Sequence, residues 1–243
     1  MSDIDEVKRL LARLNEDQLR RVQSHVRRML PKHPLEERLM ISADGMLDAL
    51  DRAGDFTIRM IRGIFAEAAF ATEVLPEISD EWRQLPLPFA DPPYDFLLTD
   101  LPNPEFPPPG LSHPTVRVQV KMQRSAKKQP LFANNVWKRR MNWPADHYVV
   151  EVQKSRKGDK KGERTRPYRF NEFDILAVSL GPALGRWGAF MYTVERWLIP
   201  DSTDDSHILK YQPVAQSDND CWTSEFLTAV TWLRGGEKRR IGA

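Results

Sequence analysis

VRVQVKM at residues 116–122 decides the fold, together with PYDFLL at residues 93–98. Each stretch predicts a β-strand, because both are rich in β-branched or bulky apolar residues and lie between turn-forming residues. Alternate residues of a strand share a face. One face of the second strand therefore carries the long polar side chains of Arg117, Gln119 and Lys121, and the other carries Val116, Val118 and Val120.

The two strands predict an ion-binding site if they pair as a hairpin. Asp95 of the first strand then lies close to Gln119 and Lys121 of the second. Two oxygen ligands and an ammonium would meet at one place, which suits a hard divalent cation and a phosphate. An alternative stays open, in which Asp95 caps a turn after Pro93 while Gln119 and Lys121 line the solvent face of an edge strand.

Asp95 and the triplet Gln119-Val120-Lys121 resemble the motif of the PD-(D/E)xK nuclease superfamily, in the variant where glutamine replaces the middle acid. The first half of the motif matches loosely, because Tyr94 separates Pro93 from Asp95. Residues 165–178, TRPYRFNEFDILAV, look like a segment of type II restriction endonuclease-like proteins. The resemblance spans about residues 58–199. It implies a Mg²⁺-dependent phosphodiesterase on a mixed sheet flanked by helices.

The resemblance also implies roles for single residues. Asp95 and the amide oxygen of Gln119 would hold Mg²⁺, for which Mn²⁺ is expected to substitute, and Lys121 would orient or deprotonate the attacking water or stabilise phosphate charge. Glu67 matches the acidic residue that the helix before the hairpin often supplies to the metal, although it could instead reach solvent. Asp100 is a rival ligand, but five residues from Asp95 it should face the opposite side. An amide carries no charge, so metal affinity should fall.

Helical patterns surround this region. Apolar spacing predicts amphipathic helices at residues 3–30, broken at 15–17, and further helices at 42–50 and 56–74. In the last of these, Glu67 lies within an apolar stripe formed by Met60, Gly63, Ile64, Phe70, Ala71 and Val74. We expect a helical region at residues 1–55 that suits dimerisation and a nuclease-like domain at residues 56–243.

The remaining segments complete the predicted α/β (α+β) fold, a central mixed β-sheet flanked by helices with an N-terminal helical arm. Residues 102–114 are proline-rich and predict a loop between the hairpin strands. The other predicted elements are helices at 132–140 and 223–233 and strands at 147–153, 173–180 and 188–198.

Composition limits the class of protein. The 243 residues are 41% hydrophobic and 29% charged, which is typical of an ordinary globular protein. The single cysteine, Cys221, excludes an internal disulfide and a cysteine cluster for zinc. No apolar run approaches the ~20 residues that span a bilayer, and the start lacks a signal-peptide layout. We expect a cytoplasmic protein.

Charge distribution suggests a phosphate-binding face. The net charge is only +2, but basic residues gather between residues 117 and 169. The alternative interpretation is that these basic residues belong to solvated loops. The predicted DNA contacts are Arg124, Lys127, Lys128, Asn134, Asn135, Lys138, Arg139, Arg140, Arg166 and Arg169. Tyr168 lies between the last two.

These features predict a Mg²⁺-dependent endonuclease of restriction type that cleaves double-stranded DNA as a homodimer. A methyltransferase acting on the same site is its expected partner. Two alternatives remain: a DNA repair or genome-maintenance nuclease of the same fold, and a catalytically inactive DNA-binding module, which the presence of Gln119 keeps open.

Overall fold

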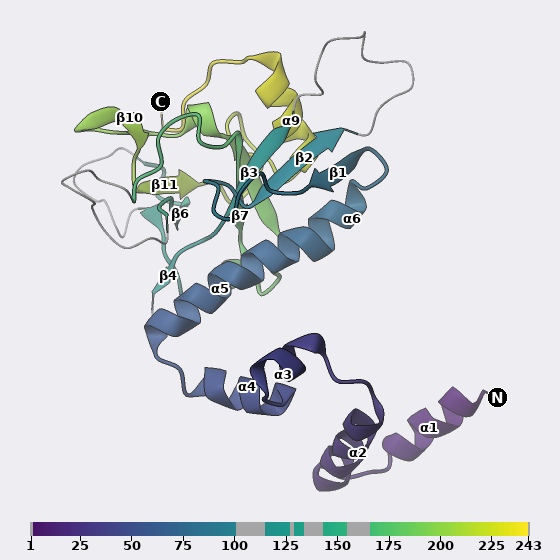
Figure 1. Cartoon of the computed structure of the whole chain (residues 1–243). Coiled ribbons are helices and arrows are strands. Elements are labelled where there is room, and N and C mark those ends of the chain that lie inside the picture. The colour runs from purple at the N-terminus through teal and green to yellow at the C-terminus, as the bar shows by residue number, and fades with distance from the viewer. Residues whose placement is uncertain (1, 101–114, 127–128, 134–142, 155–165, 243) are drawn as a thin grey trace. The chain divides into compact units, whose positions relative to one another are not determined.

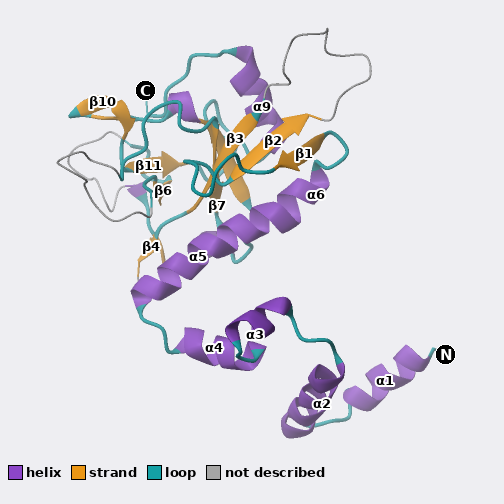
Figure 2. Ribbon diagram, viewed as in Figure 1, coloured by secondary structure: helices purple, strands orange, loops and turns teal. Residues whose placement is uncertain are grey.

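The computed structural model describes residues 2–100, 115–126, 129–133, 143–154 and 166–242. The chain divides into two compact units, Met1–Ile58 and Arg59–Ala243. The first unit is helical, and the second contains a β-sheet with helices (Figure 1 and Figure 2). The predicted mixed α and β class is confirmed.

Short capped helices form the first unit. They are α1 (Asp3–Leu11), α2 (Glu16–Met29), α3 (Pro34–Leu39) and α4 (Ala43–Asp51). The side chains of Ser2, Asn15 and Ser42 accept hydrogen bonds from backbone N–H groups in the first turns of α1, α2 and α4. The helices predicted at residues 3–30 and 42–50 are confirmed, and Asn15 accounts for the predicted break. The sequence did not indicate α3.

The helix predicted at residues 56–74 forms as α5 (Asp55–Ala69), the π-helical turn η1 (Phe70–Val74) and the short α6 (Leu75–Glu77). Its predicted apolar stripe is wrong in part. Met60 and Ile64 are 57% and 58% exposed, whereas Ala66, Ala69, Phe70 and Val74 are buried. Only the second half of α5 packs on the sheet, and the buried face continues through the π turn at Phe70 and Val74.

Five strands form the central sheet, in the order β1-β2-β3-β7-β8. They are β1 (Trp82–Leu85), β2 (Phe96–Asp100), β3 (Val116–Met122), β7 (Ile175–Ser179) and β8 (Phe190–Val194). β3 runs antiparallel to β2, with Phe96 opposite Val118, and parallel to β7, with Gln119 opposite Leu176. The predicted hairpin is confirmed. β3 is the middle strand, so the edge-strand alternative is wrong.

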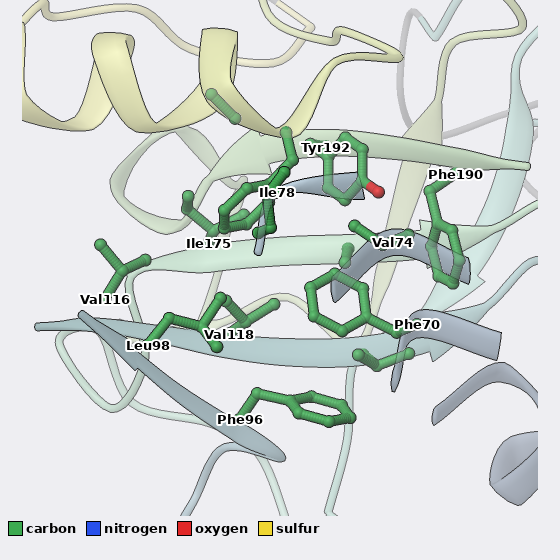
Figure 3. Close-up of a cluster of buried hydrophobic side chains, with 14 of the residues drawn as sticks. Phe70, Val74, Ile78, Phe96, Leu98, Val116, Val118, Ile175, Phe190 and Tyr192 are labelled. Atoms are coloured by element: carbon green, nitrogen blue, oxygen red, sulfur yellow. The ribbon is translucent and has the colours of Figure 1, made fainter. Parts of the chain in front are cut away.

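The two faces of the sheet belong to separate apolar clusters. Val116, Val118 and Val120 share an apolar cluster with Phe70 and with residues of α9 (Phe226–Gly235), and Figure 3 shows Val116, Val118 and Phe70 of this cluster. Leu176 and Val178 point to the second cluster, which contains Tyr168 and Val150. This division confirms the alternation predicted for residues 116–122, and it leaves the polar face of β3 beside the second cluster.

Smaller elements complete the second unit. β6 (Tyr148–Glu151) pairs with β11 (Tyr211–Val214), β9 (Pro200–Asp201) with β10 (Asp204–Ile208), and β4 (Ser125–Ala126) with β5 (Gln129–Pro130). The helical turns α8 (Gly181–Leu184) and η2 (Glu195–Trp197) flank β8.

The other sequence predictions have mixed outcomes. The strands at 147–153 and 173–180 and the helix at 223–233 are confirmed as β6, β7 and α9. The strand at 188–198 ends earlier than predicted, because the chain turns into η2 after β8. The predicted loop at 102–114 and most of the helix at 132–140 lie outside the described residues. Among the helices of the described residues, none is long and apolar enough to cross a membrane.

Candidate active site

Asp95 lies at the start of β2, where the chain enters the sheet. Its backbone N–H donates to the carbonyl of Val118 at 2.9 Å, which extends the β2–β3 pairing by one residue. Its side-chain Oδ2 accepts the backbone N–H of Val120 at 2.7 Å and the Nε2 group of Gln119 at 2.5 Å. The carboxylate is thus held against the middle strand by two donors.

Gln119 is buried, with 1% of its surface exposed. Besides its bond to Asp95, Nε2 donates to the carbonyl of Val120 at 3.1 Å. Oε1 accepts the hydroxyl of Tyr168 at 2.9 Å. The amide nitrogen therefore faces Asp95 and the amide oxygen faces Tyr168, for which the sequence predicted only a position between two DNA contacts.

Lys121 follows two residues after Gln119 and lies on the same side of β3. Its Nζ is 5.6 Å from the centre of the Tyr168 ring, within cation–π range. Burial lowers the pKa of Lys121, and the charges of Asp95, Glu67 and Glu151 oppose that change. The pKa of Lys121 is therefore lower than that of an exposed lysine, and its neutral amine forms more readily.

Glu67 approaches the same place from α5. Burial and the negative charge of Asp95 raise the pKa of Glu67 to about 7, while the charge of Lys121 lowers it. Burial also raises the pKa of Asp95, and the charge of Lys121 and the N–H of Val120 lower it. The structure therefore brings Glu67, Asp95, Gln119 and Lys121 together. Their catalytic and metal-binding roles remain predictions.

Asp100 and Arg117 belong to other contacts. Arg234 of α9 donates from Nη2 to Asp100 at 2.5 Å. Arg117 shares the polar face of β3 but pairs with Asp174 at 2.7 Å. The expectation that Asp100 faces away from Asp95 agrees with its partner on α9.

The donor set can be compared with the needs of Mg²⁺, which prefers hard oxygen ligands and keeps several waters. The negative charge of Asp95 raises the pKa of Glu67, and burial raises the pKa of both carboxyl groups, so a bound cation would favour their charged forms. They fit the ion. The Gln119 amide does not fit as an oxygen ligand in its present orientation, because Oε1 accepts from Tyr168. In the described part of the chain, no three His, Cys, Asp or Glu side chains could jointly hold a metal.

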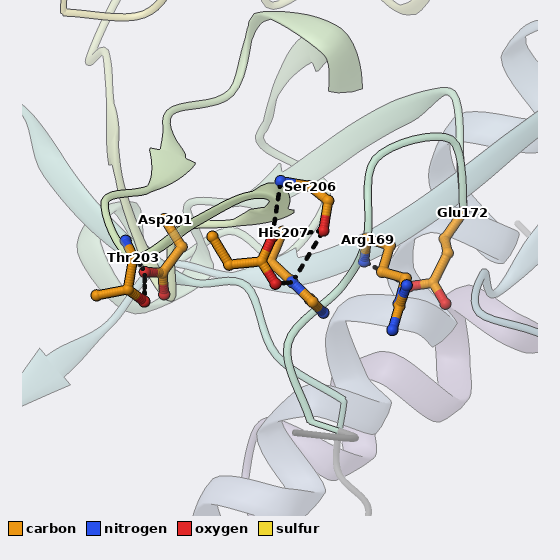
Figure 4. Close-up of polar contacts among 7 residues, drawn as sticks. Arg169, Glu172, Asp201, Thr203, Ser206 and His207 are labelled. Carbon is orange, nitrogen blue, oxygen red and sulfur yellow. Dashed lines mark hydrogen bonds and ion pairs between the residues drawn. The ribbon is translucent and has the colours of Figure 1, made fainter. Parts of the chain in front are cut away.

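The predicted DNA contacts can be placed only in part. Arg124 is half-buried and pairs with Glu151 through Nη1. Arg166 and Arg169 are exposed. The backbone N–H of Arg169 donates to Glu172 at 2.9 Å, and both residues appear in Figure 4. The others lie outside the described residues: Lys127, Lys128, Asn134, Asn135, Lys138, Arg139 and Arg140.

A second polar cluster, around the β9–β10 turn, was not predicted from the sequence (Figure 4). Asp201 accepts the backbone N–H and hydroxyl of Thr203, and Asp204 accepts those of Ser206. Asp204 also contacts Nδ1 of His207 at 2.7 Å. Such short-range bonds are typical of Asp in turns, so we assign this cluster to the turn itself.

Comparison with known proteins gives few matches. No protein-family model matches the chain, and neither does any curated protein. Among solved structures, the chain is similar to a bacterial homing endonuclease with a TM-score of 0.38 and 16% identity, over 76% of this chain and 100% of that chain. A likeness this distant carries no argument about function.

Proposed function

We propose that the chain is a Mg²⁺-dependent endonuclease that hydrolyses phosphodiester bonds of double-stranded DNA, as a sequence-specific restriction enzyme of PD-(D/E)xK type. The convergence of Asp95, Lys121 and Glu67 from β2, β3 and α5 is the observation that carries this proposal. Two carboxylates beside an amine of lowered pKa form the minimal group for metal-assisted hydrolysis.

Each residue has a distinct part in this proposal. Glu67 and Asp95 would hold Mg²⁺ or Mn²⁺, and Gln119 would join them through its oxygen only if its amide turned over. When bound, Mg²⁺ supplies neutralisation of negative charge on the scissile phosphate. Lys121 accepts a proton from the attacking water or stabilises charge on the phosphate, and its lowered pKa favours the first role.

The wider proposal concerns assembly and partners. Residues 56–243 act as the nuclease domain and residues 1–55 as a dimerisation arm. A homodimer would match a two-fold symmetric DNA site, with Arg124, Arg166, Arg169 and the basic residues at 127–140 as DNA contacts. The partner of such an enzyme in the cytoplasm would be a methyltransferase that modifies the same site.

A catalytically inactive DNA-binding module is the second candidate. The orientation of Gln119 favours this candidate, because the amide nitrogen points toward Asp95. An acidic residue at this position would instead present an oxygen that could bind a cation. Such a protein would keep its DNA affinity without cleaving.

Digestion of unmodified genomic DNA and supercoiled plasmid, with and without Mg²⁺ or Mn²⁺, tests both candidates. Lys121→Ala is expected to lower the cleavage rate by about 10²–10⁴-fold, the usual contribution of a general acid or base. Lys238→Ala, at an exposed lysine, is the matched control and should cleave like wild type. Wild-type cleavage by Lys121→Ala would refute the catalytic assignment. DNA binding without cleavage in either metal would favour the inactive module.

A further inference from the structure

The Gln119 side chain has an orientation that its neighbours determine. Its nitrogen lies between two acceptors, Oδ2 of Asp95 at 2.5 Å and the carbonyl of Val120 at 3.1 Å. Turning the amide over would place its oxygen against those two oxygens. Buried acceptors that face one another without a donor are unfavourable, so hydrogen bonding selects the orientation in which the Gln119 nitrogen points toward Asp95.

Tyr168 completes the hydrogen bonding of the amide from the other side. Its hydroxyl donates to Oε1 at 2.9 Å, and the two residues are 49 positions apart in the chain. Every hydrogen-bonding group of the Gln119 amide then has a partner: both N–H groups donate and the oxygen accepts.

The phenol that makes this contact is itself fixed. Tyr168 is 3% exposed, and its ring packs edge-on against Phe173 with 5.3 Å between ring centres. Its backbone carbonyl accepts the N–H of Ile208 at 2.8 Å. The ammonium groups of Lys121 and Lys154 lie 5.6 Å and 5.2 Å from the ring centre. A phenylalanine would keep the ring contacts and lose only the hydroxyl.

We propose that Tyr168 is a positioning residue: by donating to Oε1 it completes the hydrogen bonding that holds the Gln119 amide with Nε2, and not Oε1, facing Asp95 and orienting that carboxylate. In this assignment Gln119 acts as a neutral donor and not as a metal ligand. The assignment deepens the proposed function and rests on it wherever a cation is concerned. Oδ2 of Asp95 is occupied by two donors, whereas Oδ1 has no hydrogen bond within the described residues, which leaves Oδ1 to meet the ligand.

Nuclear magnetic resonance of the full ¹⁵N-labelled chain tests this assignment without any activity measurement. Comparison with Gln119→Met identifies the side-chain amide signals of Gln119. In wild type without cation, one Nε2 proton should be shifted downfield by its bond to the carboxylate. Tyr168→Phe should reduce that shift and speed exchange of these protons with water about 5-fold or more, the effect of losing ~1 kcal/mol.

Tyr192→Phe is the matched control, because Tyr192 is equally buried but packs in the other apolar cluster. It should leave the Gln119 signals unchanged. Melting temperatures of both variants close to that of wild type would show that neither disturbs the fold. Unchanged Gln119 signals in Tyr168→Phe would overturn the assignment.

Adding Mg²⁺ to wild type gives the second readout. The downfield Gln119 signal should persist while other signals near Asp95 move. If the Gln119 signal moves instead to the position of a free amide, its oxygen binds the ion and the assignment is overturned. If no signal near Asp95 responds to Mg²⁺, the proposed nuclease function fails, while the result for Tyr168→Phe still decides the positioning role.

Discussion

Two carboxylates and one ammonium in the candidate site change one another's protonation. Burial favours the neutral form of each group, while Lys121 favours the charged forms of Glu67 and Asp95. A lysine in this position can exchange a proton closer to neutral pH than an exposed lysine can. A further positive charge close to Glu67 would lower the pKa of Glu67, as the charge of Lys121 already does.

A second acid with a raised pKa lies away from this site. Glu195 is 3% exposed at the start of η2 and accepts the backbone N–H of Asn171 at 2.5 Å. Burial raises the pKa of Glu195 to about 7, against the lowering effects of that N–H and of Arg117. The folded state therefore holds a proton that the unfolded chain releases near the ordinary glutamate pKa of 4.5.

The sign of the pH effect follows from this difference. The contribution of Glu195 is most favourable below the unfolded pKa and is lost as pH rises through the folded pKa. Glu195→Gln keeps an acceptor for Asn171 without a charge, so it should raise the free energy of unfolding at pH 8 by roughly 1–3 kcal/mol and change it little at pH 5.

Urea denaturation at the two pH values measures this change. Glu81→Gln, at an exposed glutamate, serves as the control and should show no pH-dependent gain. Equal stability of Glu195→Gln and wild type at pH 8 would contradict the prediction.

At the level of elements, the β2–β3 hairpin could be predicted because its side chains repeat every two residues. That period alone determines which residues of β3 meet the apolar cluster and which remain for the site. The placement of Asp95 near Gln119 follows directly from pairing the strands. The helical stripe of α5 was less predictable, since nothing in its sequence shows which half packs on the sheet.

Other parts of the site and fold leave no comparable pattern. Tyr168 and Gln119 are 49 positions apart in the chain, and no local sequence pattern predicts a contact over such a separation. β1 has the sequence WRQL, without β-branched residues or apolar alternation, yet it pairs with β2, and its Trp82 packs edge-on against Phe226 of α9. Tertiary packing determines both features.

The π turn places Phe70 at the centre of the first apolar cluster. Its ring centre lies 4.8 Å from that of Phe96, 5.7 Å from that of Phe190 and 5.9 Å from that of Phe226. Phe70→Ala should therefore lower the free energy of unfolding by about 3–5 kcal/mol. Phe89→Ala, at a 58% exposed position, should change it by less than about 0.5 kcal/mol. Chemical denaturation followed by circular dichroism distinguishes the two, and similar losses in both variants would argue against the packing described.

At the scale of the whole molecule, the first unit lacks a core of its own. None of its helices α1 to α4 contains a buried residue, and apolar residues such as Val26 and Met29 are 45% and 73% exposed. Isolated helices of this length are marginally stable in water. Covering these faces in a second copy of the chain would supply the missing burial, as the proposed homodimer requires.

Substitution on α2 tests that assembly. Val26→Glu places a charge on the apolar side of the helix and should shift the sedimenting species from dimer to monomer. Gln23→Glu adds the same charge at an exposed polar position of the same helix and should leave the dimer intact. Analytical ultracentrifugation measures both, and a monomeric wild type would rule out the dimer.

Paired strands in the interior of the sheet hold the backbone of Asp95, Gln119 and Lys121, so connecting segments other than the one that carries Tyr168 do not have to keep these residues in place. Connecting segments can then be lengthened, shortened or exchanged between relatives while the reacting atoms keep their spacing. An engineer who wished to change the target of the proposed enzyme would accordingly randomise those other connections and leave the hairpin and Tyr168 untouched.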